Sequence, residues 1–280
     1  MEKIAVTGGS GLVGSALIPV LQQAGHEAFA WKRPYDPAML EGVTVIINLA
    51  GENLSTGRWS QQRKARILNS RVETLESIFR MIEGKPNTIH TLISSSASGY
   101  YGSVTSQKVF REEDPAGSDF LADVCRLWEN AADSFSALGI RVLKLRTGVV
   151  FSQHGGALPK LMMPLKFGIS APLGSGNQWL PWIHIEDLVR MILHLMEHKV
   201  LAGPFNAASP NPLTNRQLAK QLATEHKKLY LPFGPPAFLL RILLGEMSTV
   251  VLEGSRLSAE KILAAGFSFR HEEVVTRDGL

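Results

Sequence analysis

Residues 4–14 read Ile-Ala-Val-Thr-Gly-Gly-Ser-Gly-Leu-Val-Gly, and this stretch decides the fold class. A short apolar run ends at a cluster of small residues, and apolar side chains then recur at helical spacing over residues 12–21. This order predicts a strand, a tight turn and a helix. Glycines at positions 8, 11 and 14 let the backbone approach a pyrophosphate, whose charge is met by N–H groups at a helix N-terminus. The alternative is a glycine-rich turn that packs closely and binds nothing.

The segments that follow alternate between strand-like and helical patterns. Apolar runs predict strands at Glu27–Trp31, Val43–Leu49, Thr91–Ile93 and Val142–Leu145, and helical periodicity predicts helices at Arg63–Ile82 and Leu121–Leu138. Such alternation indicates an α/β protein with a doubly wound, Rossmann-like parallel sheet covered by helices on both faces. The interval between residues 31 and 43 is too short for a further strand and helix, so we expect the sheet to be one strand short on that side.

The amino-acid composition of the chain changes after Phe151, where Gly, Pro and Trp become frequent. We expect residues 1–152 to form a dinucleotide-binding domain to which residues 183–208 return, with a helix at Ile185–Glu197. Residues 153–182 and 209–280 are expected to form a smaller substrate-binding region. Within it, a helix is predicted to begin at an N-cap residue, Thr214 or Asn215.

Composition narrows the class of protein. The chain has 280 residues, 45% of them hydrophobic and 19% charged, which is typical of a globular protein. Its net charge of +4 comes from scattered Lys and Arg side chains, which favours small anionic molecules over nucleic acid. The single cysteine, Cys125, excludes an internal disulfide, and no Cys/His spacing resembles a metal site. Apolar runs are too short to span a bilayer and no leader precedes the first strand, so a cytoplasmic location is expected.

Two basic residues follow the second predicted strand. An NAD site normally has an acidic side chain at this position, which binds the adenosine ribose hydroxyls. Here the position holds Lys32 and Arg33, whose charges suit a 2′-phosphate. The alternative is a solvated basic loop. On this feature we expect NADP(H) rather than NAD(H).

Several motifs together resemble the extended short-chain dehydrogenase/reductases, and more narrowly their atypical epimerase-family branch, described as nucleoside-diphosphate-sugar epimerases. The likeness runs nearly end to end. It rests on Thr7-Gly-Gly-Ser-Gly-Leu-Val-Gly14, Asn48-Leu-Ala-Gly-Glu52, Ser94-Ser-Ser-Ala-Ser-Gly-Tyr-Tyr-Gly102, Leu145-Arg-Thr-Gly-Val-Val150 and Pro181-Trp-Ile-His-Ile-Glu-Asp-Leu188, together with Gly174–Ile185, Gly203–Asn206, Glu253–Arg256 and Ala265–Phe269.

The resemblance implies a nicotinamide cofactor and the residues around it. The implied cofactor-binding residues are Thr7, Gly8, Gly11, Leu12, Val13 and Gly14 in the turn, Lys32 and Arg33 at the adenosine phosphate, and Leu49, Ala50 and Gly51 alongside. In this branch a Ser-Arg pair on the next helix also reaches the cofactor, and it matches Ser70-Arg71. Without the resemblance, Arg71 would be read as a solvated helix residue.

The chain departs from the family in its proton-transfer residues. Extended members use a Tyr-x-x-x-Lys pair in which the Lys lowers the pKa of the Tyr. No tyrosine here has a Lys four places on, and the matching positions hold Leu121 and Cys125. Ser96 matches the family serine that contacts a reacting oxygen, with Ser98 as a rival. The catalytic candidates are therefore Ser96, Tyr100 and Tyr101, although either tyrosine can equally pack the wall of the cleft.

Two functions follow from these residues. The first is an NADP(H)-dependent oxidoreductase or epimerase acting on a small polar substrate. The alternative is a non-catalytic or weakly catalytic NADPH-binding sensor, which the missing Tyr/Lys pair favours. We expect His184 with Asp187 to join the two regions rather than to act in catalysis, and His194 with His198 to lie on the surface rather than in a metal site. A homodimer is compatible with the sequence, which leaves the substrate open.

Overall fold

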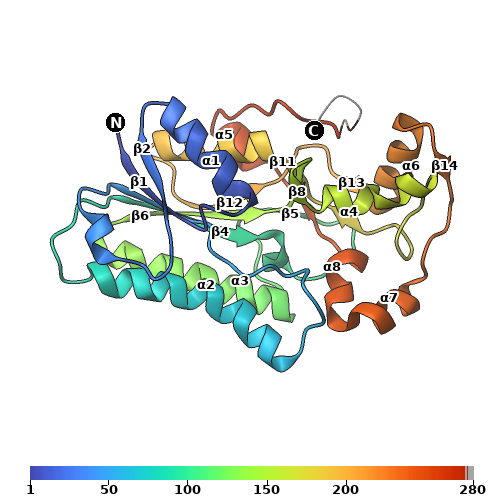
Figure 1. Ribbon diagram of the computed structural model, residues 1–280, viewed down its shortest axis with the longest axis horizontal. Coiled ribbons are helices and arrows are strands. Elements are labelled where there is room, and N and C mark those ends of the chain that lie inside the picture. The colour runs from blue at the N-terminus through green and yellow to red at the C-terminus, as the bar shows by residue number, and fades with distance from the viewer. Residues whose placement is uncertain (275, 277–280) are drawn as a thin grey trace.

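A computed structural model describes residues 1–274 and 276. Its centre is a parallel sheet of six strands in the order β12-β6-β4-β3-β1-β2 (Figure 1). The strands are β1 (Lys3–Thr7), β2 (Glu27–Trp31), β3 (Val45–Asn48), β4 (Thr91–Ala97), β6 (Arg141–Thr147) and β12 (Gly203–Ala207). The predicted α/β class is confirmed. Because β2 is the edge strand next to β1, the sheet is also one strand short on the expected side.

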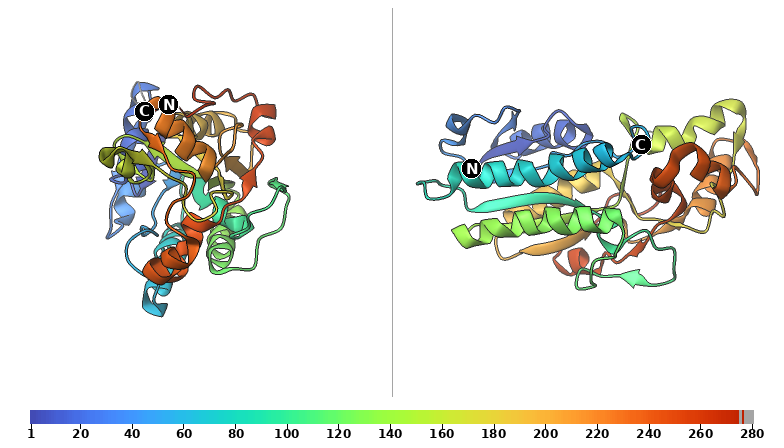
Figure 2. Two further views of the ribbon diagram at one scale, coloured as in Figure 1. Left: turned by 90° about the vertical axis from the view of Figure 1, so that its right-hand side faces the viewer. Right: turned by 90° about the horizontal axis from the view of Figure 1, so that it is seen from below.

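Two helix layers cover the sheet, as Figures 1 and 2 show: α1 (Leu12–Gln23) and α5 (Ile185–Glu197) lie on one face, α2 (Gln61–Ile82) and α3 (Phe120–Asp133) on the other. Successive strand residues alternate between the two cores. Ile4 and Val6 pack with α1 and α5, whereas Ala5 between them packs with α2 and α3. Both faces of the strands are thus buried, which is why the sequence shows continuous apolar runs.

The remaining elements lie mostly beyond the carboxyl ends of the main strands, at the right of Figure 1. Their helices are α4 (Leu158–Met162), α6 (Asn215–Glu225), α7 (Ala237–Leu244), α8 (Thr249–Leu252) and α9 (Glu260–Ala264). Their strands are β5 (Val109–Phe110), β7 (Val149–Ser152), β8 (Gly155–Gly156), β9 (Ile169–Ser170), β10 (Trp179–Leu180), β11 (Trp182–His184), β13 (Leu213–Thr214), β14 (Leu229–Tyr230) and β15 (Arg256–Leu257). Thr214 is the N-cap of α6 and forms a capping box with Gln217. The division of the chain into two domains stays a prediction.

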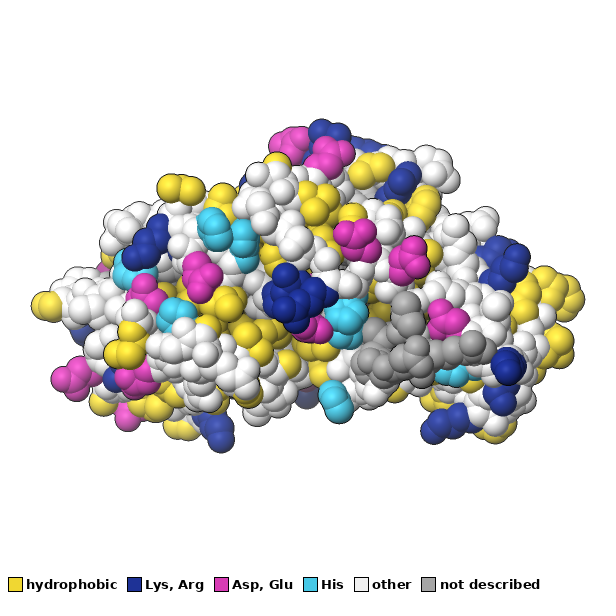
Figure 3. Space-filling view, turned by 90° about the horizontal axis from the view of Figure 1, so that it is seen from above, with side chains coloured by type: hydrophobic (Ala, Val, Ile, Leu, Met, Phe, Trp, Pro, Cys, Tyr) yellow, Lys and Arg dark blue, Asp and Glu magenta, His cyan; other side chains and the backbone are white. Residues whose placement is uncertain are grey.

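The described part of the chain was compared with two sequence-based expectations, on surface charge and on membrane-spanning helices. On the face shown in Figure 3, Lys and Arg side chains are interspersed with Asp and Glu rather than gathered into one basic stripe. In the part of the chain that the structure describes, no helix has both the length and the apolar character needed to cross a membrane. The cytoplasmic location stays a prediction.

Candidate functional site

The glycine turn lies between the end of β1 and the start of α1. Gly8 has a φ of +68°, and a Cβ there would stand 2.6 Å from the carbonyl oxygen of Leu49. A Cβ on Gly14 would stand 2.5 Å from the Cα of Gly9, so this glycine lets the helix pack on the turn. Gly11 differs, because a Cβ there would meet only the Gly8 carbonyl oxygen, at 3.2 Å. The space beside Gly11 is therefore open.

The start of α1 has the properties of an anion site. Gly11 is its N-cap and supplies no side-chain hydrogen bond, and the first turn holds no acidic residue. Leu12, Val13 and Gly14 follow directly. Backbone N–H groups at such an uncapped start attract negative charge. The turn therefore offers the open space and the N–H donors that the predicted pyrophosphate site requires.

Lys32 and Arg33 follow β2, the neighbour of β1 in the sheet. Both side chains are exposed, and within residues 1–274 and 276 neither forms a hydrogen bond or an ion pair. Two unpaired cations are thus available to a phosphate at the edge strand beside the glycine turn.

The end of β3 forms the opposite side of the turn. The Thr7 hydroxyl donates to Asn48 Oδ1 at 2.6 Å, and Asn48 Nδ2 donates to Ser94 Oγ at 3.3 Å, which ties together the ends of β1, β3 and β4. Thr7 is fully buried in this network. Leu49, Ala50 and Gly51 follow Asn48, with Leu49 against Gly8 and Gly51 exposed. The predicted cofactor-binding residues at the ends of β1 and β3 are thus brought together.

Arg71 reaches this loop from α2. Its Nη2 donates to the carbonyl oxygen of Glu52 at 3.1 Å and its Nη1 to that of Ile67 at 2.9 Å. The guanidinium lies where a side chain of Gly51 would point and 5.1 Å from the ring centre of Trp128. Arg71 is buried rather than solvated.

Comparison with known proteins assigns the chain to a family. The profile described as the NAD dependent epimerase/dehydratase family matches residues 4–208. The chain belongs to the NAD dependent epimerase/dehydratase family. A domain of unknown function, DUF1731, matches residues 235–276. The resemblance to an epimerase-family branch of the short-chain dehydrogenase/reductases is confirmed.

Individual members of this epimerase family resemble the chain over its whole length. Epimerase family protein YfhF of Bacillus subtilis is 35% identical over 97% of this chain and 95% of its own. Human epimerase family protein SDR39U1 (isoform 2), solved with NADPH, has a TM-score of 0.87 and 27% identity over 97% of this chain and 96% of that one. A nucleoside-diphosphate sugar epimerase from Corynebacterium glutamicum has a TM-score of 0.79 and 30% identity, covering 97% of this chain and 56% of that one.

A cleft of about 220 Å³ lies beyond the ends of β4 and β6, where doubly wound folds bind ligands. Leu121 and Cys125, at the positions of the epimerase-family Tyr and Lys, both line it. Burial raises the pKa of the Cys125 thiol to about 12, so the thiol is neutral near pH 7. The position of the usual proton-transfer pair is therefore apolar. Other lining residues include Leu54, Arg71, Ser98, Gly99, Trp128, Thr147, Trp179 and Glu253.

Ser96 belongs to a buried ionic network beside the cleft. Its hydroxyl donates to Glu129 Oε1 at 2.7 Å, and Glu129 is paired with Arg146 through bonds of 2.8 and 3.0 Å. Burial opposes the charge on Arg146, but the hydrogen bonds and charge of Glu129 raise its pKa. Ser96 is not among the residues that line the cleft, whereas its rival Ser98 is. A catalytic role for Ser96 stays a prediction.

Tyr100 and Tyr101 pack around the same arginine. The Tyr101 hydroxyl donates to Asn206 Oδ1 at 2.7 Å and accepts from Arg146 Nη1 at 3.0 Å. The guanidinium of Arg146 lies 3.4 Å from the ring centre of Tyr100. Burial raises the pKa of Tyr101 to about 12. Neither tyrosine lines the cleft, so this geometry favours the packing alternative over their predicted catalytic role.

Glu129 and Arg146 are the site neighbours that sequence reasoning missed. Arg146 occupies a buried position of β6, next to the apolar residues Val142, Leu143 and Leu145 in the same strand, and Glu129 lies on the buried face of α3. A charged side chain at a buried strand position needs a buried partner, but Arg141 and Lys144 in the same strand hide Arg146 as a signal in the sequence. The sequence does not show which acidic residue is the partner of Arg146.

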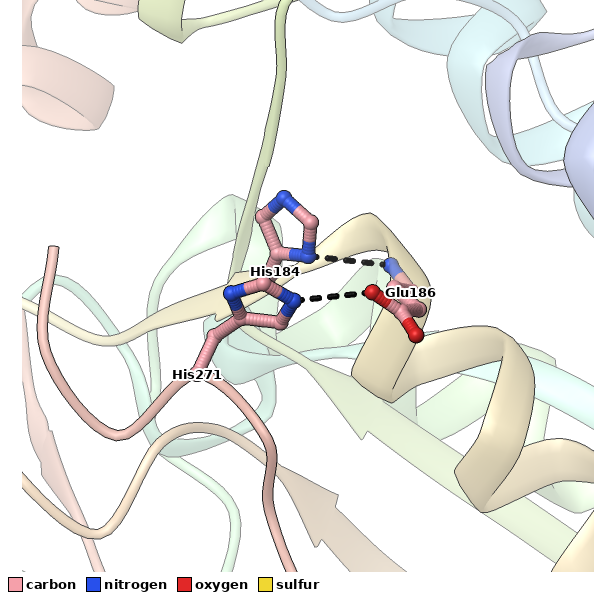
Figure 4. A group of neighbouring side chains, drawn as sticks. All are labelled: His184, Glu186 and His271. Carbon is pink, nitrogen blue, oxygen red and sulfur yellow. Dashed lines mark hydrogen bonds and ion pairs between the residues drawn. The ribbon is translucent and has the colours of Figure 1, made fainter. Parts of the chain in front are cut away.

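A second cluster joins the chain's end to α5. His184, Glu186 and His271 offer ligand atoms within 4.8 Å of one another (Figure 4). However, His184 Nδ1 accepts the Glu186 N–H as the helix N-cap, and His271 Nε2 bonds to Glu186 Oε2 at 2.9 Å. The two imidazole rings are tilted by 40° with centres 3.7 Å apart. The ring nitrogens that face Glu186 are thus engaged in hydrogen bonds, so this arrangement caps a helix rather than presenting a ready metal site. The rings of His194 and His198 are tilted by 31° with centres 3.9 Å apart.

Proposed function

We propose that the protein binds NADP(H) and transfers hydride between the nicotinamide and a small polar molecule held in the cleft. The observation that carries the cofactor choice is the unpaired cation pair, Lys32 and Arg33, beside a turn with room at Gly11 and an uncapped helix start. The NADPH in the human relative's structure supports the same choice.

The cofactor-binding set carried by this proposal has three parts. The turn residues Gly8, Gly11, Leu12, Val13 and Gly14, together with the Thr7 backbone, hold the pyrophosphate; Lys32 and Arg33 hold the 2′-phosphate; and Leu49, Ala50 and Gly51 flank the dinucleotide. When bound, the nicotinamide supplies a hydride donor or acceptor. The chain's own contribution is orientation and an apolar cleft that excludes water.

A second candidate function is an NADP(H) sensor with little catalysis. The observation that favours it is the apolar pair Leu121 and Cys125, since neither side chain exchanges a proton readily near pH 7. Ser96, Tyr100 and Tyr101 remain the proposed catalytic residues if turnover occurs, and Ser98, which faces the cleft, is the rival hydroxyl.

Turnover separates the two functions. The purified protein is loaded with NADPH and given a panel of small aldehydes, ketones and sugars while nicotinamide absorbance is followed. Catalytic oxidation of NADPH by any compound supports the enzyme. Saturable NADPH binding without turnover of the panel supports the sensor, and absence of NADPH binding contradicts both.

A further inference from the structure

Helix α7 carries an exposed apolar surface at one end of the molecule (Figure 1). None of its eight residues is buried. Phe238 and Ile242, one helical turn apart, are 66% and 65% exposed, and Phe233 just before the helix is 77% exposed. Single exposed apolar side chains are normal, but a group of large ones marks an interaction site. We call this group the apolar patch; it consists of Phe233, Phe238, Leu239, Ile242 and Leu243.

The segment that carries α7 is fastened to the rest of the protein at both ends. Before the helix, the Pro235 carbonyl oxygen accepts from the Gly174 N–H at 3.0 Å. After the helix, Glu246 forms an ion pair with Lys64 of α2. The apolar patch is thus held between two fixed points of the structure.

Positive charge is concentrated in the same region of the chain. Residues 153–182 and 209–244 contain seven Lys or Arg and one Asp or Glu, whereas the whole chain has 29 and 25. Arg241 of α7, Lys166 and Lys228 are exposed, and none of the three forms an ion pair with a described residue. Hydrophobic and basic side chains lie side by side at the right-hand end of Figure 3. The apolar patch therefore belongs to the part of the protein that holds its excess positive charge.

This combination of charge and exposure favours one kind of partner. A second copy of the chain, paired about a two-fold axis, would bring the same basic region of both copies together, and like charges repel. An anionic lipid surface attracts these cations, and its headgroup boundary takes up Phe, Leu and Ile side chains that project from an exposed helix. Docking of this kind is peripheral, so it needs no membrane-spanning helix.

We propose that the apolar patch and Arg241 dock this end of the molecule onto an anionic membrane surface. The apolar side chains insert at the depth of the headgroups, and Arg241 contacts the negative headgroups. Lys166 and Lys228 add attraction at longer range, within the Debye length. The cofactor site takes no part in this docking, so the proposal is independent of the proposed function.

The test is co-sedimentation of the full chain with vesicles made either of phosphatidylcholine alone or of equal parts of phosphatidylcholine and phosphatidylglycerol. We expect at least about tenfold tighter binding to the anionic vesicles, which weakens as salt is added. Phe238→Ser/Ile242→Ser should lower binding to the anionic vesicles by more than about tenfold, because two apolar side chains no longer insert. Arg241→Gln should lower it about fivefold, the contribution of one basic residue near the surface.

The matched control is Met39→Ser/Val200→Ser, because both side chains are exposed and apolar but lie outside the apolar patch. This variant should bind the anionic vesicles like the wild type. Thermal melts of all variants should match the wild type, since every substituted side chain is exposed.

Four results overturn the proposal. The first is equal or absent binding of the wild type to the two kinds of vesicle. The second is wild-type affinity in a folded Phe238→Ser/Ile242→Ser protein, and the third is an equal loss of affinity in the control. The fourth is a dimer in lipid-free solution that Phe238→Ser/Ile242→Ser dissociates, as measured by analytical ultracentrifugation, which would assign the apolar patch to a second copy of the chain.

Discussion

Gly11 and Gly14 belong to the same glycine motif, but they differ in the room that the structure leaves for a side chain. A Cβ on Gly14 collides with the backbone of Gly9 at 2.5 Å, whereas Gly11 has a φ of −76° and space beside it. Of these two glycines, only Gly11 can therefore be substituted to test ligand binding without also disturbing the fold.

Gly11→Val is expected to weaken NADPH binding by more than about tenfold, because the branched side chain fills the approach to the helix N-terminus. Its melting temperature should stay close to that of the wild type. Gly14→Val is the contrasting variant and should lose stability as well. Fluorescence titration with NADPH and thermal melts check both, and a folded Gly11→Val protein with wild-type affinity would contradict this assignment.

Ser96 tests whether the buried network serves structure or chemistry. Removing its hydroxyl leaves Glu129 without one donor, so Ser96→Ala should cost about 1–3 kcal/mol of unfolding free energy. Once a substrate is known, a catalytic role predicts a loss of about 10²–10³ in kcat/KM. The burial of Ser96 favours the stability loss with kcat/KM little changed. Urea denaturation and steady-state kinetics on the same variant decide between the two roles.

Elements with strong local patterns could be predicted from the sequence. The bounds of β2 and α5 match the expectation, because the apolar run of β2 and the helical pattern of α5 are strong local signals. The last turn predicted for α3 is a 3-10 segment, Ser134–Leu138, instead. The two-residue strands of the smaller region carry too little pattern to be predicted, since their pairing depends on partners far along the chain.

The candidate site likewise has a part that could be predicted from the sequence and a part that could not. The glycine turn, the basic pair and the missing Tyr/Lys pair depend on residues close in sequence, and they were accessible from it. Ser96, Tyr101 and Arg71 have hydrogen-bond partners in other elements that lie 19 to 105 residues away in the sequence. Which of these residues meet cannot be read from a single sequence.

The N-terminus of α5 is expected to make stability depend on pH. Burial, and then the neighbouring His271, lower the pKa of His184 below its ordinary value of 6.5. The neutral form is thus favoured in the folded protein, so this stabilisation is complete above about pH 6.5 and is lost as the pH falls through the lower, folded pKa. His271, Glu186 and Asp187 surround the same imidazole.

His184→Asn keeps an N-cap side chain but cannot titrate, so its free energy of unfolding should fall less than that of the wild type between pH 7.5 and pH 5. The exposed His154→Asn is the control and should follow the wild type. Chemical denaturation at both pH values measures the difference. Parallel losses in all three proteins would show that His184 does not contribute.

At the scale of the whole molecule, residues 270 and 271 are held against α5 and so against the helix layer of the sheet. Asp187 is fully buried on α5, and its carboxylate accepts the backbone N–H groups of Arg270 and His271 at 2.9 and 2.8 Å. Farther on, the Thr276 hydroxyl bonds to His226 of the smaller region at 2.9 Å. This segment connects α5 with the region around α6.

Asp187→Ala should therefore destabilise the fold by about 1–3 kcal/mol in total, because two part-buried N–H groups lose their acceptor. Hydrogen exchange of residues 270 and 271 should accelerate by the same mechanism, while exchange in β1 reports global stability. Unchanged exchange at residues 270 and 271 would mean that Asp187 does not hold this segment.

The glycine turn and the Lys32/Arg33 pair are proposed to form one NADP(H) site. The most direct test is calorimetric measurement of the Kd values of NADPH and NADH for the wild type and for the Lys32→Ala/Arg33→Ala double variant. We predict that the wild type prefers NADPH by at least about tenfold, as expected for charge-assisted bonds to the 2′-phosphate. The double variant should lose that preference through weaker NADPH binding, with its NADH affinity unchanged. Equal affinities in the wild type, or a preference that survives in the double variant, would contradict the claim.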